Sequence, residues 1–292
     1  MDHGNIDLVM KTSTDNGNSW SSLKIIWNDG NNTCGNPTPV QDRLTGDILL
    51  IATLNNDKVF VLRSHDEGMN WEKPVDITST VKPENWKWYA SGPVHAIQLQ
   101  QGRYKNRIVV PCNHTLAGID KHISHVIYSD DHGLSWQLGG SVSLDKTDEC
   151  TVAELSDYTL LLNMRNSDRS LPNRKTSISN DGGLSWSIPK FDSTLIEPVC
   201  QGALLRYSYS PSLLLFANPK HETKRQNLTL SISKDDGKTW TRQITIHAKK
   251  AAYNDLTLLH NGNILCVFET GKILPYSGIC ATTIQQSAIT EQ

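Results

Sequence analysis

One eight-residue stretch decides the fold, Ser129-Asp130-Asp131-His132-Gly133-Leu134-Ser135-Trp136. The apolar run Val126-Ile127-Tyr128 precedes this stretch and predicts a strand. The Asp131 side chain is suited to accept backbone N–H bonds inside a turn, and Gly133 is suited to a positive φ. Trp136 begins the returning segment and offers a large apolar face to the turn. The stretch therefore predicts a β-hairpin.

The same pattern, Ser-x-Asp-x-Gly-x-x-Trp, occurs five times and begins at positions 13, 64, 129, 179 and 233, at intervals of 51, 65, 50 and 54 residues. Hairpins about 50 residues apart are typical of β-propellers, in which each repeat forms one four-stranded blade. The five copies use five of the eight Trp residues, which explains why Trp outnumbers the four Phe. A calcium loop is the alternative, but the copies lack the alternating oxygen ligands of an EF-hand.

Short apolar runs outside the five copies follow turn residues and predict buried inner strands. Helix signals are weak, and no linker or low-complexity stretch divides the chain. We therefore expect an all-β chain with one domain over residues 1–292. The runs are Ile48–Ala52, Arg107–Pro111, Leu160–Met164, Leu213–Ala217 and Ile264–Phe268.

The composition excludes some classes of protein. The 28 basic and 30 acidic residues give a net charge of −2, which argues against a nucleic-acid-binding protein. The chain has no apolar run of 18 residues, so we expect no membrane span. We also find no cysteine or histidine spacing typical of a metal site, and we expect no metal and no cofactor.

The repeats, together with several other segments that occur in the family's order, resemble the sialidase (neuraminidase) family of bacterial type. The resemblance covers essentially the whole chain and implies a six-bladed β-propeller with exo-α-sialidase activity. The segments that carry it are Asp2–Val9, Gly35–Val40, Asp42–Gly46, Trp88–Leu99, Asp148–Cys150, Asn163–Asn166 and Ala252–Leu256.

The resemblance implies that Tyr253 is the nucleophile, that Glu149 is its base and that Asp2 is the general acid/base. The substrate chemistry agrees with a tyrosine. A sialoside carries a carboxylate on its anomeric carbon, which would repel a carboxylate nucleophile but not a neutral hydroxyl group. Asp148 is the local competitor of Glu149, and we rank it lower.

The substrate carboxylate calls for arginine, whose planar guanidinium group binds a carboxylate through two hydrogen bonds. The resemblance implies this role for Arg165 and Arg225, and it implies that Glu269 braces a further arginine. Arg165 follows an apolar strand, where an unpaired charge is costly, so we expect a ligand or an acidic partner beside it. Five residues are weaker candidates for lining the sugar pocket, namely Asn36, Trp88, Tyr89, His95 and Asn113.

The family's first arginine has no counterpart here, because only Met1 precedes Asp2. The repeat spacing averages close to 55 residues, so six blades need roughly 330 residues. We therefore expect a chain truncated at its N-terminus, with the ring-closing blade incomplete. An unpaired strand edge is expected near Ile264–Phe268 or Gly278–Thr283.

The function expected from the resemblance is hydrolysis of terminal sialic acid with retention through a covalent tyrosyl intermediate. Sialylated glycans, glycoproteins or glycolipids are the expected partners, and we expect a monomer. The resemblance favours a secreted or periplasmic location, although no signal peptide is visible in the chain. Three alternatives stay open: a catalytically impaired sialic-acid-binding propeller or enzyme fragment, a protein-interaction scaffold, and a trans-sialidase.

Overall fold

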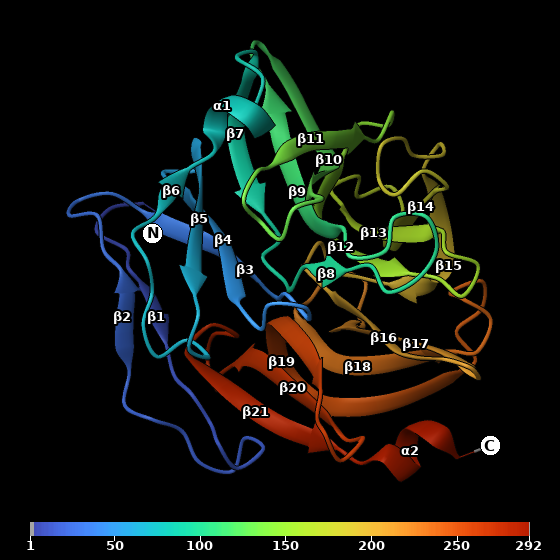
Figure 1. The fold of residues 1–292 in the computed structure, drawn as a ribbon. Coiled ribbons are helices and arrows are strands. Elements are labelled where there is room, and N and C mark those ends of the chain that lie inside the picture. Colours follow the sequence, from blue (N-terminus) through green and yellow to red (C-terminus); the bar gives the residue numbers. More distant parts are fainter. Residues whose placement is uncertain (1–2, 292) are drawn as a thin grey trace.

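The strands form antiparallel sheets that are arranged around a common centre like the blades of a propeller (Figure 1). The structure is a computed structural model that describes residues 3–291. Within that range there are one two-stranded, two four-stranded, one five-stranded and one six-stranded sheet. The predicted all-β class is confirmed, because α1 (Thr78–Val81) and α2 (Gln286–Thr290) are only four and five residues long. Neither helix has the length and apolar character needed to span a bilayer.

The first half of the chain forms three of these sheets. A short hairpin comes first and consists of β1 (Leu8–Met10) and β2 (Lys24–Trp27). The next sheet has the order β3 (Cys34–Gln41), β4 (Ile48–Leu54), β5 (Lys58–Ser64) and β6 (Val75–Asp76). The third sheet contains β7 (Trp86–Ser91), β8 (Ile97–Gln98), β9 (Ile108–Leu116), β10 (Ile119–Ser129) and β11 (Gln137–Ser141).

The second half of the chain forms the other two sheets, in which strands that follow each other in the sequence pair with each other. The four-stranded sheet contains β12 (Thr147–Glu154), β13 (Leu160–Asn166), β14 (Asn173–Ser179) and β15 (Lys190–Ile196). The six-stranded sheet contains β16 (Ala203–Tyr209), β17 (Ser212–Pro219), β18 (Gln226–Ser233), β19 (Arg242–Leu258), β20 (Ile264–Thr270) and β21 (Gly278–Ile284).

Strand β19 links two halves of the six-stranded sheet. Its first part, Arg242–Lys250, pairs with β18, and its second part, Ala251–Leu258, pairs with β20. The register of the β19–β20 pair shifts between Ala251 and Asn254. Such irregularities re-aim side chains and are common next to functional sites.

The apolar runs form strands as expected, but not the innermost ones. Each run lies in a strand that pairs with another strand on both sides. Examples are Ile48–Ala52 in β4 and Leu160–Met164 in β13. The strands nearest the centre in Figure 1 include β3, β12 and β16. The prediction that these runs are buried is confirmed. Burial does not distinguish them from the strands nearest the centre, because β12 is also buried along its whole length.

The five repeats are hairpin turns held by side-chain hydrogen bonds, as predicted. In the copy at 129–136, Asp131 Oδ1 accepts from the Ser129 hydroxyl group and from the Ser135 backbone N–H, both at 2.8 Å. The Gly133 backbone N–H donates to Ser129 Oγ at 2.9 Å, and Gly133 has a φ of +77°. The same serine–aspartate contact occurs in all five copies, at 2.8 Å in four of them and at 2.9 Å between Ser64 and Asp66.

The tryptophan of each copy precedes the returning strand instead of starting it. Strand β11 begins directly after Trp136, whereas β2 begins four residues after Trp20. Their burial differs accordingly, since Trp136 is 3% exposed and Trp20 is 41% exposed. The tryptophans of the first three copies nevertheless contact their own turns, because each indole N–H donates to the carbonyl oxygen of the turn glycine. How deeply each one is buried depends on the neighbouring sheet.

One edge of the six-stranded sheet is open within residues 3–291. Strand β21 pairs only with β20 there, which agrees with the edge expected at Gly278–Thr283. The alternative edge at Ile264–Phe268 is wrong, because this segment lies in β20 and pairs with both β19 and β21. Ile279 on β21 is 75% exposed.

Two histidines form a contact in the core of the β7–β11 sheet. His114 Nδ1 lies 3.0 Å from His125 Nδ1, so one ring must donate a proton to the other. The His114 ring stacks on Trp86 with 3.3 Å between ring centroids. Burial lowers the pKa of His114 to about 3, and burial together with His114 lowers the pKa of His125 well below its usual value.

This pair is expected to make the fold sensitive to acid. Below the unfolded pKa of 6.5, the unfolded chain binds protons that the folded chain refuses, so folded stability falls as the pH drops. Each histidine contributes a slope of about 1.4 kcal/mol per pH unit until its folded pKa is reached. Urea unfolding between neutral and acidic pH measures this slope for the native chain and for His114→Asn.

The comparison between variants isolates the pair, because His65 and His95 have raised pKa values and act in the opposite direction. We expect His114→Asn to flatten the pH dependence, while the same change at the exposed His260 leaves it unchanged. An equal slope in the native chain and in His114→Asn would contradict the prediction. NMR titration of the native histidines provides a second measurement that needs no variant.

Candidate active site

Tyr253 lies in β19 at the point where this strand changes its pairing partner. It sits within the register shift between Ala251 and Asn254. Its backbone N–H donates to Glu269 Oε2 at 3.2 Å. Its hydroxyl group donates to Oε1 of Glu149, a residue 104 positions earlier in the chain. The fold therefore joins two residues from different sheets.

Glu149 is supplied by β12, one of the strands nearest the centre, where the register against β13 also shifts. Its side chain is 9% exposed. Burial raises the pKa of the Glu149 carboxyl group, although the charge of Arg165 opposes this shift. The neighbouring Asp148 accepts a hydrogen bond from the Ser167 hydroxyl group at 3.0 Å instead. The carboxylate that contacts Tyr253 is therefore that of Glu149.

Arg165 lies near the end of β13 and contacts both of these residues. Its Nη1 donates to Glu149 Oε2 at 2.7 Å and to the Tyr253 hydroxyl oxygen at 3.2 Å. The expected acidic partner of this arginine is thereby confirmed. Burial acts against the charged guanidinium group, but Glu149 and Asp148 outweigh it and hold the pKa of Arg165 above its ordinary value.

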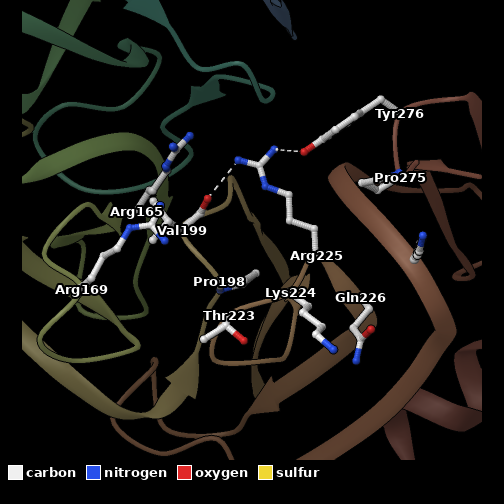
Figure 2. A pocket seen from close by; sticks show the side chains of 11 residues that line it. Arg165, Arg169, Pro198, Val199, Thr223, Lys224, Arg225, Gln226, Pro275 and Tyr276 are labelled. Carbon is white, nitrogen blue, oxygen red and sulfur yellow. Dashed lines mark hydrogen bonds between the residues drawn. The ribbon is translucent and has the colours of Figure 1, made fainter. Parts of the chain in front are cut away.

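Arg225 approaches Tyr253 from the loop between β17 and β18. Its guanidinium carbon lies 5.3 Å from the centroid of the Tyr253 ring. Figure 2 shows its two hydrogen bonds, to the Val199 carbonyl oxygen at 3.0 Å and to the Tyr276 hydroxyl oxygen at 3.1 Å. The neighbouring Lys224 is exposed. Arg225 is thus the basic residue of this loop that lies beside Tyr253.

Glu269 on β20 belongs to the same region, because its side chain accepts the hydrogen bond from the Tyr253 backbone N–H. Burial raises the pKa of its carboxyl group. No arginine forms an ion pair with Glu269 in the part of the chain that the structure describes. Asp2, for which the sequence predicts the acid/base role, lies outside the described residues.

The arrangement of Tyr253, Glu149 and Arg165 is suited to covalent chemistry. Burial and, after it, the negative charge of Glu149 raise the pKa of the Tyr253 hydroxyl group well above its usual value, so the resting hydroxyl is neutral. Glu149 is already placed to take its proton, and the two arginines supply positive charge for an anionic substrate group. Among the described side chains, no group of three or more His, Cys, Asp or Glu is placed to hold a metal ion.

The segment at residues 88–95 is divided between the core and the candidate site, since Pro93 and Val94 line one pocket with Tyr253. Tyr89 is fully buried and packs in the core, 5.1 Å from the His125 ring between centroids. The expectation that Tyr89 lines the pocket is therefore corrected, because no part of its side chain reaches solvent. Trp88 is half-buried and lies 6.4 Å from the His122 ring between centroids.

His95 lines a cavity with a volume of about 790 Å³, whose walls come from the strands around the central opening. Its Nδ1 is 2.6 Å from Asp255 Oδ1. Burial favours the neutral ring, but the Asp255 carboxylate raises the pKa of His95. Asp255 was not singled out from the sequence, although it lies two residues after Tyr253.

The two asparagine candidates differ in their surroundings. The Asn36 side-chain amide donates to Thr53 Oγ1 at 2.8 Å. Asn113 is fully buried in β9, which corrects its expected contact with sugar hydroxyl groups. A sequence pattern does not reveal which face of a strand is covered by another blade.

The structure also shows a buried ion pair that the sequence did not reveal. Arg174 Nη1 lies 3.0 Å from Glu197 Oε2, and neither side chain is more than 1% exposed. Glu197 Oε1 accepts from the Asn166 backbone N–H at 2.5 Å, next to Arg165. Arg174 also donates to the Cys200 carbonyl oxygen at 2.7 Å. The pair therefore fixes the segments that carry Arg165 and the Val199 carbonyl oxygen.

Comparisons with known proteins identify the family and the relatives of this chain. A family model described as a BNR repeat-like domain matches residues 1–266. A sialidase of Micromonospora viridifaciens is 29% identical over 94% of this chain and 48% of its own length. The chain thus spans about half the length of this curated relative.

Solved structures of sialidases also resemble this chain. The Hadza microbial sialidase Hz136 has a TM-score of 0.86 and 25% identity, over 97% of this chain and 60% of its own. A leech intramolecular trans-sialidase has a TM-score of 0.83 and 16% identity, over 97% of this chain and 64% of its own. At that lower identity the likeness concerns the fold alone.

Proposed function

Because the chain belongs to the sialidase family through its BNR-repeat-like domain, we propose that it is an exo-α-sialidase that hydrolyses terminal sialic acid from glycoconjugates. The observation that carries this proposal is the hydrogen bond from the Tyr253 hydroxyl group to Glu149, with Arg165 bound to both residues. A neutral nucleophile with a carboxylate base beside it suits a substrate whose reacting carbon bears a carboxylate.

We propose the following roles in the reaction. The Tyr253 oxygen forms a bond to the anomeric carbon as its proton passes to Glu149. The glycosidic C–O bond breaks, and the leaving oxygen takes a proton from the general acid, which the resemblance assigns to Asp2. Water then displaces the tyrosyl oxygen and gives one proton to the carboxylate left on the general acid, which restores that acid. The proton on Glu149 returns to Tyr253. Two displacements at one carbon give retention of configuration.

Arg165 and Arg225 hold the substrate carboxylate in this proposal. Their guanidinium groups flank the Tyr253 side chain, one through a hydrogen bond at 3.2 Å and the other over the ring at 5.3 Å. Both are fixed before substrate binds, Arg165 by Glu149 and Arg225 by Val199 and Tyr276. Fixed cations stabilise an anionic substrate without reorganisation.

We further propose that the ring has six blades. The six-stranded sheet divides at β19, where the pairing partner changes from β18 to β20. Counting its two parts separately and including the β1–β2 hairpin gives six groups of strands around the centre. Figure 1 supports this count, since the groups follow each other around the ring in chain order.

A fluorogenic sialoside tests the proposed function directly. We expect release of the fluorophore, and NMR during the first turnovers should detect the α anomer of sialic acid before it equilibrates. Early appearance of the β anomer would contradict the double displacement. Addition of a lactose acceptor distinguishes hydrolysis from transfer, because a trans-sialidase forms a sialylated acceptor with the same residues.

A binding protein without turnover is the second candidate, and one observation favours it. Glu269, which the resemblance assigns to brace a further arginine, has no arginine as an ion-pair partner within residues 3–291. Two arginines retain part of the affinity for a carboxylate. Calorimetry that shows sialic acid binding, without any hydrolysis by the chain, would support this candidate over the enzyme.

A further inference from the structure

A strongly basic pocket opens beside the candidate active site and has a volume of about 430 Å³, within the usual range of ligand sites. Figure 2 shows Arg165 and Arg169 on one side of the pocket and Arg225 and Lys224 on the other. The pocket has no Asp or Glu in its lining. The cationic side chains that line it are Arg165, Arg169, Lys224, Arg225 and Lys250.

Four of these five cations have no carboxylate partner anywhere in the described part of the chain. Only Arg165 has acidic partners, Glu149 and Asp148. The Lys250 ammonium group donates to the Ile273 carbonyl oxygen, and the Arg169 and Lys224 side chains are exposed to solvent. Gathered like charges repel one another and produce a local positive potential that attracts an anion.

The basic character is specific to this pocket. The chain as a whole has a net charge of −2, so a general excess of cations does not explain it. The nearest acids in the sequence lie elsewhere. Asp168 Oδ1 is 3.9 Å from Lys146 Nζ, and Glu222 lines a different pocket with Lys220 and His221.

We propose that this pocket is a second anion subsite, formed by Arg169, Lys224 and Lys250, for a negatively charged group on the same glycan as the sialic acid that is removed. The proposal rests on the proposed sialidase function and deepens it. The subsite binds an acidic substituent near the scissile bond, either a sulfate ester or the carboxylate of a second sialic acid.

Arg225 connects the two sites. Its guanidinium group lies over the Tyr253 ring and also lines the basic pocket. The exposed cations Arg169 and Lys224 lie in the loops after β13 and before β18, and the contact with the Tyr253 ring is made by Arg225. A group held there belongs to the part of the glycan beside the bound sialic acid, and not to the reacting carbon.

Three substrates test the subsite, namely a monosialyl glycan with a neutral core, the same glycan with a sulfate ester on the neighbouring sugar, and a disialyl glycan. We expect kcat/KM to be about tenfold higher for at least one acidic substrate at low salt, because several partly exposed ion pairs each add a small factor. The two acidic substrates distinguish sulfate from carboxylate. The advantage should shrink at about 0.5 M salt, where exposed charges are screened.

The variant Arg169→Gln/Lys224→Gln should lower this preference to about twofold or less, since both changes remove charge and retain a polar side chain. The matched control is Lys105→Gln, an exposed lysine in the turn between β8 and β9, which should keep the full preference. Thermal unfolding of both variants checks that the fold is intact.

Calorimetry separates failure of this proposal from failure of the proposed function. If the chain hydrolyses no sialoside, the sialidase function fails, while tighter binding of the sulfated or disialyl glycan than of the neutral one still supports the subsite. Equal kcat/KM for all three substrates at low salt, or a preference that Arg169→Gln/Lys224→Gln leaves unchanged, overturns the subsite even if hydrolysis is fast.

Discussion

Tyr253→Phe is expected to lower kcat on a fluorogenic sialoside by about three orders of magnitude or more, because the variant removes the atom that forms the covalent bond. The change deletes one oxygen and leaves the ring in place under Arg225. Glu149 and Arg165 retain each other as partners at 2.7 Å. Steady-state kinetics with the purified chain measures the effect.

The control for this prediction is Tyr207→Phe. The Tyr207 hydroxyl group donates to the Gly262 carbonyl oxygen at 3.0 Å, so the control also removes one hydrogen bond from a partly buried tyrosine. We expect its kcat to stay within about twofold of the native value, since a single neutral hydrogen bond affects mainly stability. Activity of Tyr253→Phe comparable to that of the control would exclude Tyr253 as the nucleophile.

Arg174→Met is expected to lower the free energy of unfolding by about 3–5 kcal/mol, because it leaves the Glu197 carboxylate buried without a cation. Arg174 also donates to Asn163 Oδ1 at 2.7 Å and to the Cys200 carbonyl oxygen, so further polar atoms lose a partner. Urea unfolding measures the loss. A rise in KM is also expected, since Glu197 binds the backbone of Asn166 beside Arg165.

Two further variants decide whether burial causes this loss. Arg242 is 32% exposed and its partner Glu291 is 69% exposed, so Arg242→Met should cost at most about 1 kcal/mol. The double variant Arg174→Met/Glu197→Leu should recover much of the loss, because it removes the unpaired charge as well. If Arg174→Met costs no more than Arg242→Met, the buried pair contributes little to stability.

Local chemistry explains why the sequence predicted the turns so well. Each repeat contains within eight residues the serine, the aspartate and the glycine that hold its turn, and the structure shows the same contact in every copy. The exposed fraction of Trp20 is more than ten times that of Trp136, and no local signal distinguishes the two residues. Their environments depend on neighbouring sheets, which residues far away in the chain provide.

In the candidate site, too, the sequence predicted the residues and the tertiary structure decided their surroundings. The sequence and its family resemblance predicted Tyr253, Glu149, Arg165 and Arg225, and the structure brings these four together. It removed Tyr89 and Asn113 from the set by burying them completely. The burial of a strand residue depends on the sheet packed against it, which alternation along one strand does not specify.

The sequence by itself determined that this chain forms repeated hairpins and, through its resemblance, which residues to examine for catalysis. These properties depend on neighbouring residues in the chain or on motifs that are short. Only the tertiary structure decided that Tyr253 reaches Glu149 across 104 residues, that Arg174 and Glu197 form a buried pair, and that unpaired cations gather beside Arg225. The physical reason is that these contacts join residues far apart in the chain. The contact between Tyr253 and Glu149 joins separate sheets, whose arrangement depends on the packing of the whole ring.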